Sequence, residues 1–81
     1  MTDSRYLKES TSPVEALRIE RTSMNQETFA KACGIPLRTY GRWIRGETKP
    51  APTIKQIKQI CKVLGIVYAK DIPEFRPQDK S

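Results

Sequence analysis

The stretch that decides the fold is residues 25–46, NQETFAKACGIPLRTYGRWIRG, which has the pattern of two short helices joined by a tight turn. Asn25 suits the cap of the first helix. The apolar positions of that helix share the spacing of a single buried stripe: Phe29, Ala30 and Cys33. Gly34 favours a helix end, because glycine adopts a left-handed conformation at no steric cost, and Pro36 suits the start of the next helix. The turn is therefore short.

The second helix, up to about Arg45, has two unlike faces. Tyr40, Trp43 and Ile44 fall on one side, where they fit a core better than a stacking surface for bases. The opposite side carries Leu37, Arg38, Gly41, Arg42 and Arg45. A helix-turn-helix of this kind lays its second helix in the major groove of DNA, where an arginine bonds both acceptors of a guanine edge. The pattern therefore predicts a DNA-reading helix.

Size and composition limit the other classes of function. The chain has 81 residues, 37% of them hydrophobic, which is enough for one small core and too little for a buried catalytic cleft. There is no histidine, and Cys33 and Cys61 are far apart. We therefore expect buried thiols, no metal, no cofactor, no small-molecule substrate and no enzymatic activity. No apolar run approaches the roughly 20 residues of a membrane span, and the first residues lack a signal-peptide pattern, so we expect a cytoplasmic protein.

The basic residues are concentrated in one part of the chain. The net charge is +6, yet residues 31–62 alone hold eight basic residues and one acidic residue, Glu47. Such a patch favours a polyanionic partner, for which the DNA backbone is the first candidate. A membrane surface is the competing anion, but the bulky apolar residues it would need are committed to the core. We expect no membrane partner.

The regions on either side of this pattern indicate one domain, residues 12–72. Residues 1–11 are polar and without periodicity, which is typical of a flexible arm. Ser12, Pro13 and Glu15 form a capping-box pattern, which predicts a helix to about Arg21.

A proline-rich loop, residues 47–52, follows the second helix of the pair. Thr53 with Gln56 repeats the capping box, and the helix that follows has the strongest apolar stripe in the chain: Ile54, Ile57, Ile60, Cys61 and Leu64. Beyond Gly65, we expect Ile66 and Val67 to close the core, one more helical turn over residues 68–72, and a tail over residues 73–81. The apolar residues Tyr68, Ile72 and Phe75 either complete the core or form a dimer contact, and the sequence does not decide between these.

With these elements the chain resembles the Cro and phage-repressor class of helix-turn-helix proteins, also called the xenobiotic-response-element family. The resemblance covers about residues 14–66 and depends on the segments NQETFAKACGI and RTYGRWIRGETKP and on the spacing of isoleucines in the last helix. It implies an all-α, compact, lambda-repressor-like bundle of four to five short helices. It also implies a sequence-specific transcription regulator, a repressor that occupies an operator in double-stranded DNA as a homodimer on two half-sites.

The resemblance also implies roles for individual residues. The base-contacting residues would be Leu37, Arg38 and Arg42, with Leu37 matched to a thymine methyl group. Gln26 would hold a phosphate or a base edge, and Arg45 and Lys49 would hold the phosphate backbone. We assign Thr39 and Arg18 to phosphates as well. Gln26 stands at a helix N-terminus, where unpaired backbone amides attract an anion.

Three positions depart from the family pattern. The family often has a glutamate where Ile44 stands, paired with an arginine that corresponds to Arg18, so we assign Arg18 to a DNA phosphate, with Glu47 as the alternative partner. Pro36 replaces the usual capping serine or threonine, which leaves that cap unexplained. Gly41 costs about 1 kcal/mol inside a helix, and it either permits a closer approach to DNA or is simply tolerated.

Two other functions remain open. A protein-interaction module that kept this fold, such as an antitoxin or an accessory subunit, would present the same basic face to an acidic protein. RNA binding is a weaker interpretation, because the aromatic residues are too few and too buried to stack on exposed bases.

Overall fold

The computed structural model describes residues 12–77 of the chain. Within this range there are four α-helices and no strand. The helices are α2 (Pro13–Arg21), α3 (Gln26–Cys33), α4 (Leu37–Arg45) and α5 (Ile54–Leu64), followed by the 3₁₀ turn η1 (Ala69–Asp71). The all-α fold with a helix-turn-helix is confirmed. The expected arm, residues 1–11, and residues 78–81 of the expected tail lie outside the described residues.

Three of the four α-helices in residues 12–77 begin where a side chain accepts a hydrogen bond from one of their first free amides. The Ser12 hydroxyl accepts from the backbone of Glu15, and the Asn25 side chain accepts from that of Thr28 at 2.8 Å. Thr53 and Gln56 form the complete reciprocal capping box that the sequence predicts. Helix α4 is the exception, because Pro36 offers no side-chain hydrogen bond to it.

Both helices of the helix-turn-helix, α3 and α4, end at a glycine. Gly34 and Gly46 have φ values of 77° and 78°, a left-handed conformation that other residues adopt only with strain. The amide of Gly46 donates back to the carbonyl of Trp43 at 3.1 Å. These glycines set both the tight turn between α3 and α4 and the exit of the chain into the proline-rich loop.

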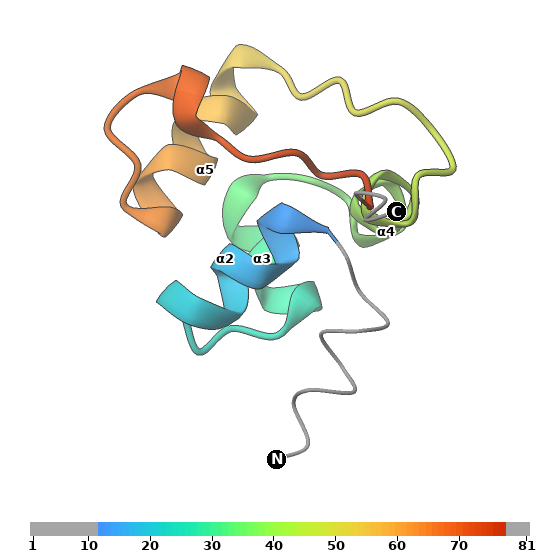
Figure 1. Ribbon diagram of the computed structural model, residues 1–81, viewed down its shortest axis with the longest axis horizontal. Helices are drawn as coiled ribbons and strands as arrows, with labels where there is room; N and C mark the ends of the chain where they lie inside the picture. The colour runs from blue at the N-terminus through green and yellow to red at the C-terminus, as the bar shows by residue number, and fades with distance from the viewer. Residues whose placement is uncertain (1–11, 78–81) are drawn as a thin grey trace.

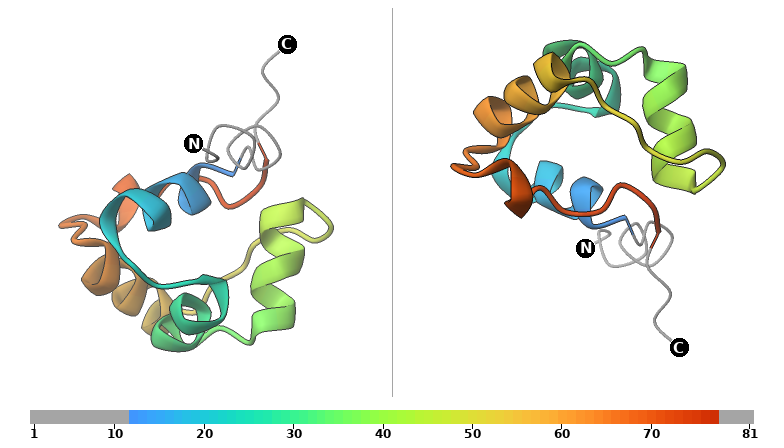
Figure 2. Two further views of the ribbon diagram at one scale, coloured as in Figure 1. Left: turned by 90° about the horizontal axis from the view of Figure 1, so that it is seen from below. Right: turned by 90° about the horizontal axis from the view of Figure 1, so that it is seen from above.

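Helix α3 is the central element of the arrangement. It packs against α5 on one side and contacts α4 on the other, while α2 also lies against α5. As a result α4 stands at one end of the molecule and α5 with η1 at the other (Figures 1 and 2). Among residues 12–77, no helix covers the face of α4 that points away from α3.

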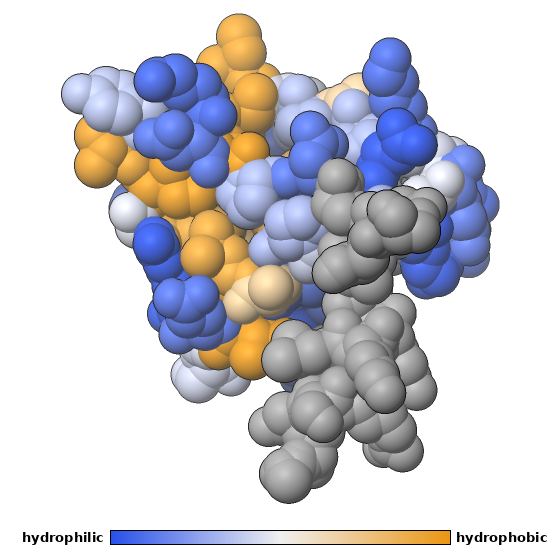
Figure 3. All heavy atoms as spheres, viewed as in Figure 1, coloured by the Kyte–Doolittle hydropathy of each residue, from blue (hydrophilic) through white to orange (hydrophobic). Residues whose placement is uncertain are grey.

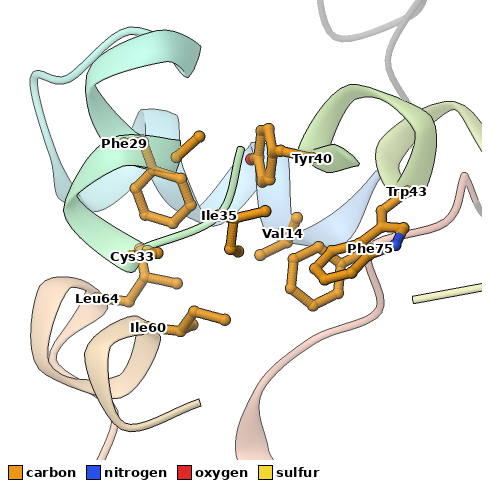
Figure 4. Packing of buried hydrophobic residues seen from close by; sticks show 10 residues of the cluster. Val14, Phe29, Cys33, Ile35, Tyr40, Trp43, Ile60, Leu64 and Phe75 are labelled. Carbon is orange, nitrogen blue, oxygen red and sulfur yellow. The ribbon is translucent and has the colours of Figure 1, made fainter. Parts of the chain in front are cut away.

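The core lies between the four helices and the segment after η1 (Figure 4). Its buried hydrophobic residues are Val14, Phe29, Ala30, Cys33, Ile35, Tyr40, Trp43, Ile60, Leu64 and Phe75. Three ring contacts join the aromatic members, and Tyr40 and Phe75 each take part in two of them. The centroid of its ring is 5.6 Å from that of Phe29 and 6.3 Å from that of Phe75. Both Tyr40 and Trp43 are core residues, as expected.

The segment after η1 also contributes to the core. Phe75 is buried, and its ring lies edge-on to that of Trp43 with centroids 5.2 Å apart. The backbone amide of Val14 donates to the carbonyl of Glu74 at 3.0 Å, which ties this segment to the start of α2. The choice that the sequence left open for Phe75 is thus decided in favour of the core.

Val67 lies outside the core, contrary to the prediction from the sequence. It was expected to close the core, but it is 82% exposed, and only its neighbour Ile66 packs against the buried cluster. The chain reverses at Gly65, whose φ is 72°, and the amide of Ile66 donates back to the carbonyl of Cys61. After this turn the side chain of Ile66 faces the interior and that of Val67 faces solvent. Tyr68 is exposed as well.

Candidate nucleic-acid interface

The inner face of α4 fixes the direction of its outer face. Tyr40 and Trp43 are almost fully buried, and they hold the helix against α3 and the segment around Phe75. Burying two aromatic side chains of this size is the largest favourable term available to a helix of nine residues. The outer face therefore points to solvent in a defined orientation.

The outer face of α4 holds the residues expected to contact bases. Leu37 is 45% exposed, and Arg38 and Arg42 are exposed. Within residues 12–77 neither arginine takes part in an ion pair. Thr39, expected at a phosphate, is half-buried near the uncapped start of the helix. Figure 3 shows hydrophilic residues gathered on this side of the molecule, whereas apolar ones gather over α5 and the segment after it.

Lys49 lies in the loop beyond α4 and is exposed. It follows Gly46, the C-cap of α4, by three residues, and it lines a pocket with Ile57 of α5 and Ala69 of η1. Its contact with a DNA phosphate stays a prediction. The lysines of the outer face of α5, Lys55, Lys58 and Lys62, are also exposed.

Arg45, the last residue of α4, has a partner. Its Nε lies 2.7 Å from Oε2 of Glu47 and its Nη2 3.5 Å from Oε1, with both side chains more than half exposed. The hydrogen bond with Glu47 raises the pKa of Arg45, and the guanidinium holds the pKa of the Glu47 carboxyl below its usual value. The Arg45 guanidinium also lies against Gly41, which is buried.

A buried carboxylate ties three helices together beneath this face. Glu15 of α2 accepts hydrogen bonds from Arg18 on the same helix, from the hydroxyl of Tyr40 on α4, and from Nε2 of Gln26 on α3 at 2.6 Å. Burial raises the pKa of Glu15, but the hydrogen bonds from Arg18, Tyr40 and Gln26 outweigh it, so the net pKa is lowered. Burial also raises the pKa of Tyr40, and the bond to Glu15 adds to this effect. The carboxylate fixes how α3 and α4 sit relative to α2.

Arg18 is bonded inside the protein, contrary to the prediction from the sequence. It was expected to contact a DNA phosphate, with Glu47 as the alternative partner. Instead its side chain is 8% exposed, its Nε and Nη2 bond both carboxylate oxygens of Glu15, and its Nη1 donates to the carbonyl of Met24 at 2.6 Å. A guanidinium with its donors directed inward cannot reach a phosphate without breaking this network.

Gln26 stands where the sequence placed it, at the first position of α3, and is half-buried. One N–H of its side-chain amide is used by Glu15. The amide nitrogen has a second N–H and the amide oxygen two lone pairs. Its position at a helix N-terminus, where backbone amides lack helical partners, is unchanged by this bond.

Comparison with known families decides which group of proteins the arrangement belongs to. Residues 14–69, well over half of the chain, match the family described as helix-turn-helix, of the Cro/C1 or xenobiotic-response-element type. The chain belongs to this helix-turn-helix family. The family is a DNA-binding regulatory one, and its members bind double-stranded DNA. No curated protein and no solved structure matches the chain.

Three other findings bear on the helix-turn-helix chain. Among the described residues no helix is both long and apolar enough to cross a membrane. The same residues contain no group of three potential metal ligands among histidine, cysteine, aspartate and glutamate. Burial raises the pKa of Cys33 to about 11, so its thiol stays protonated at neutral pH.

Sequence reasoning missed the role of Glu15 in this helix-turn-helix protein. It placed Glu15 in a capping box, whereas the carboxylate is the acceptor at the centre of the buried network. The sequence did contain an indication that Glu15 pairs with Arg18. Because Ile44 replaces the usual acid, a buried arginine at position 18 needed another carboxylate, and Glu15 stands three residues before it on the same helix.

Proposed function

We propose that this protein is a sequence-specific DNA-binding transcription regulator that acts as a repressor by occupying an operator. The observation that supports it is the outer face of α4, where Arg38 and Arg42 are exposed and unpaired within residues 12–77. Trp43 on the opposite face is buried, so these guanidinium groups project from a fixed helix. Arginines presented in this way match the acceptors of guanine in the major groove.

The proposed contacts divide into two kinds. Leu37, Arg38 and Arg42 face the bases, with the exposed leucine side chain against a thymine methyl group. Gln26, Thr39 and Lys49 contact the phosphate backbone, which sets the register of the helix in the groove without reading sequence. Arg45, at the end of the same face, also contacts DNA.

We propose further that the protein binds as a homodimer on two half-sites about one helical turn, roughly 34 Å, apart. Helix α4 covers only a few base pairs, and two copies double the length of sequence that is read. Repression follows because a protein seated on an operator excludes other proteins from it. The dimer predicts an operator with approximate two-fold symmetry.

Selection of bound duplexes from random DNA with the purified chain tests this function. We expect recovery of a related set of sites with two-fold symmetry. The Arg38→Ala variant should then lose about 1 to 3 kcal/mol on a selected site and little on random DNA. Equal losses on both would remove the assignment of Arg38 to a base.

Lys49→Ala is the matched comparison for a phosphate contact. It should weaken binding to selected and random duplexes alike and reduce the slope of log affinity against log salt by about one unit. Lys70→Ala is the control, because it removes the same charge from η1, an element to which no DNA contact is assigned. Failure to select any site would favour the protein-interaction alternative.

A further inference from the structure

Gly41 leaves a gap on the outer face of α4 that the side chain of Arg45 fills. A β-carbon built on Gly41 would lie 2.9 Å from Nη1 of Arg45 and 3.6 Å from its Cζ. Side chains on a helix lean toward its N-terminus. Arg45 uses this direction fully, because its guanidinium lies beside a residue four positions, or about 6 Å of helix, earlier in the chain.

This position matters because of where Arg45 stands on α4. Arg45 follows Arg38 by seven residues, which places both on nearly the same side of the helix. In helix-turn-helix proteins the N-terminal part of the second helix contacts base edges. A side chain at the last position would ordinarily leave the groove, but the guanidinium of Arg45 returns by more than one turn toward it.

Glu47 fixes the orientation of this guanidinium. Its carboxylate takes the Nε side at 2.7 Å and reaches Nη2 at 3.5 Å. An arginine has five N–H donors in a planar fork. The donors left over are those of Nη1 and the second N–H of Nη2, which form the end edge that bonds guanine in a bidentate manner.

The carboxylate also distinguishes between the two kinds of DNA contact. A phosphate next to Arg45 would lie close to the negative charge of Glu47, which repels it. A guanine edge is neutral, so Glu47 opposes it far less while still holding the guanidinium in place. Arg45 was assigned to a phosphate from the family pattern, and this geometry favours a base.

We propose that Gly41 and Glu47 position Arg45 as a third base-reading arginine, which makes Glu47 a determinant of operator specificity. The proposal rests on the DNA-binding function proposed above. Glu47 acts through Arg45 and is a positioning residue.

The first test compares affinities of the full chain for a selected duplex and a random duplex at one salt concentration. Arg45→Ala should lower the ratio of the two affinities roughly 5- to 150-fold, the value of one bidentate contact. Renewed selection with this variant should lose the preference for guanine at one position of each half-site. An equal loss on both duplexes would overturn the proposal and return Arg45 to a phosphate.

Glu47→Gln separates positioning from charge. Removing a negative charge should raise affinity for random DNA, while the ratio of selected to random affinity should fall about three- to tenfold as the guanidinium loses its fixed orientation. Glu20→Gln is the control, because Glu20 is exposed on α2 and the change in charge is the same. An equal rise on both duplexes would show that Glu47 only neutralises Arg45.

Gly41→Ala tests the gap. Alanine favours the helix, so the melting temperature should rise, but its β-carbon displaces Nη1 of Arg45 and the affinity ratio should fall. In an Arg45→Ala background the same substitution should leave the ratio unchanged. If the ratio falls as much in that background, the alanine meets DNA directly and the gap has no role in positioning Arg45.

The two proposals fail in different ways. If no site can be selected from random DNA, both the proposed function and the role of Arg45 are wrong. If sites are selected and Arg38 is needed to read them, but Arg45→Ala selects the same bases at every position, only the role of Arg45 is wrong.

Discussion

Two arginine–glutamate pairs in this protein have similar contact distances and opposite surroundings. The Arg18–Glu15 pair joins Nε and Oε2 at 2.9 Å, with side chains 8% and 1% exposed. The Arg45–Glu47 pair joins the same atoms at 2.7 Å, with side chains 58% and 52% exposed. The comparison shows that contact distance alone does not define the role of an ion pair, because the surroundings decide what its loss costs.

The buried pair is structural because its charges have no water to return to. Removing ions from water costs several kcal/mol each, which excellent geometry and additional hydrogen bonds must offset. Those bonds come from Tyr40 and Gln26 to Glu15, and from Arg18 to the carbonyl of Met24. The exposed pair has water on most sides, so it contributes little to folding and remains available to orient a side chain for a partner.

The largest expected effect is the loss of stability caused by Arg18→Met. This variant keeps a long apolar stem but leaves the Glu15 carboxylate in the interior without its cation, and it should lose about 3 to 5 kcal/mol of unfolding free energy. Urea denaturation measures this directly. Arg45→Met is the matched control and should unfold at the wild-type denaturant concentration. Equal losses in the two variants would refute the distinction between the pairs.

Tyr40→Phe should have a smaller effect in the same network. The ring remains in contact with Phe29 and Phe75, but the hydroxyl that donates to Glu15 is lost. A charged buried acceptor that loses one donor should cost about 1 to 3 kcal/mol, measured by the same denaturation. Because Tyr40 comes from α4, an unchanged stability would mean that the carboxylate does not tie α4 to α2.

The sequence was sufficient wherever the cause of a feature is local. Helix limits depend on capping side chains and glycines within a few residues of each end, and the caps at Asn25 and Thr53 form as expected. The two faces of α4 follow from its helical period, since Tyr40 and Trp43 carry enough apolar surface to decide which side is buried. The assignments of Leu37, Arg38 and Arg42 to bases stay predictions.

Features that depend on residues distant in the chain were not predictable in the same way. Glu15 acts through partners on α3 and α4, and the period of its own helix carries no sign of them. Phe75 completes the core only because the chain returns past α2, where Glu74 accepts from Val14. The position of Arg45 depends on a loop residue, Glu47, whose direction no helical pattern describes.

The free energy of unfolding at acid pH should depend on the buried Arg18–Glu15 pair. Burial raises the pKa of Glu15, but its hydrogen bonds bring the net pKa below the usual value of 4.5. Between the lowered pKa of the folded state and the usual value, the unfolded chain therefore binds more protons than the folded one. The stabilisation is complete above about pH 4.5 and is lost as the pH falls through the pKa of the folded state. Stability curves of wild type and Glu15→Gln between pH 7 and pH 2 test this.

The Glu15→Gln curve should start lower at neutral pH and fall less steeply below about pH 4.5, because the group that titrates is gone. The pKa of Glu47 is also held low by Arg45, yet that carboxylate is in water and its pair is screened by solvent. A Glu47→Gln curve should therefore stay nearly parallel to that of the wild type. Parallel curves for Glu15→Gln would show that the buried carboxylate does not control acid unfolding.

The smallest expected effect is that of Glu47→Gln on stability at neutral pH. An exposed ion pair gains little attraction in water, restricts two flexible side chains and is screened by salt, so the melting temperature should equal that of the wild type at low and high salt. This null result makes the DNA measurements interpretable, because a change in the affinity ratio of this variant then does not come from unfolding. Since the charge of Arg42 also acts on Glu47, the ratio is compared with that of Glu47→Gln in an Arg45→Ala background, where only an effect through Arg42 remains. A loss of stability close to that of Arg18→Met would instead make Glu47 an anchor of the loop after α4, and the contrast between the two pairs would no longer hold.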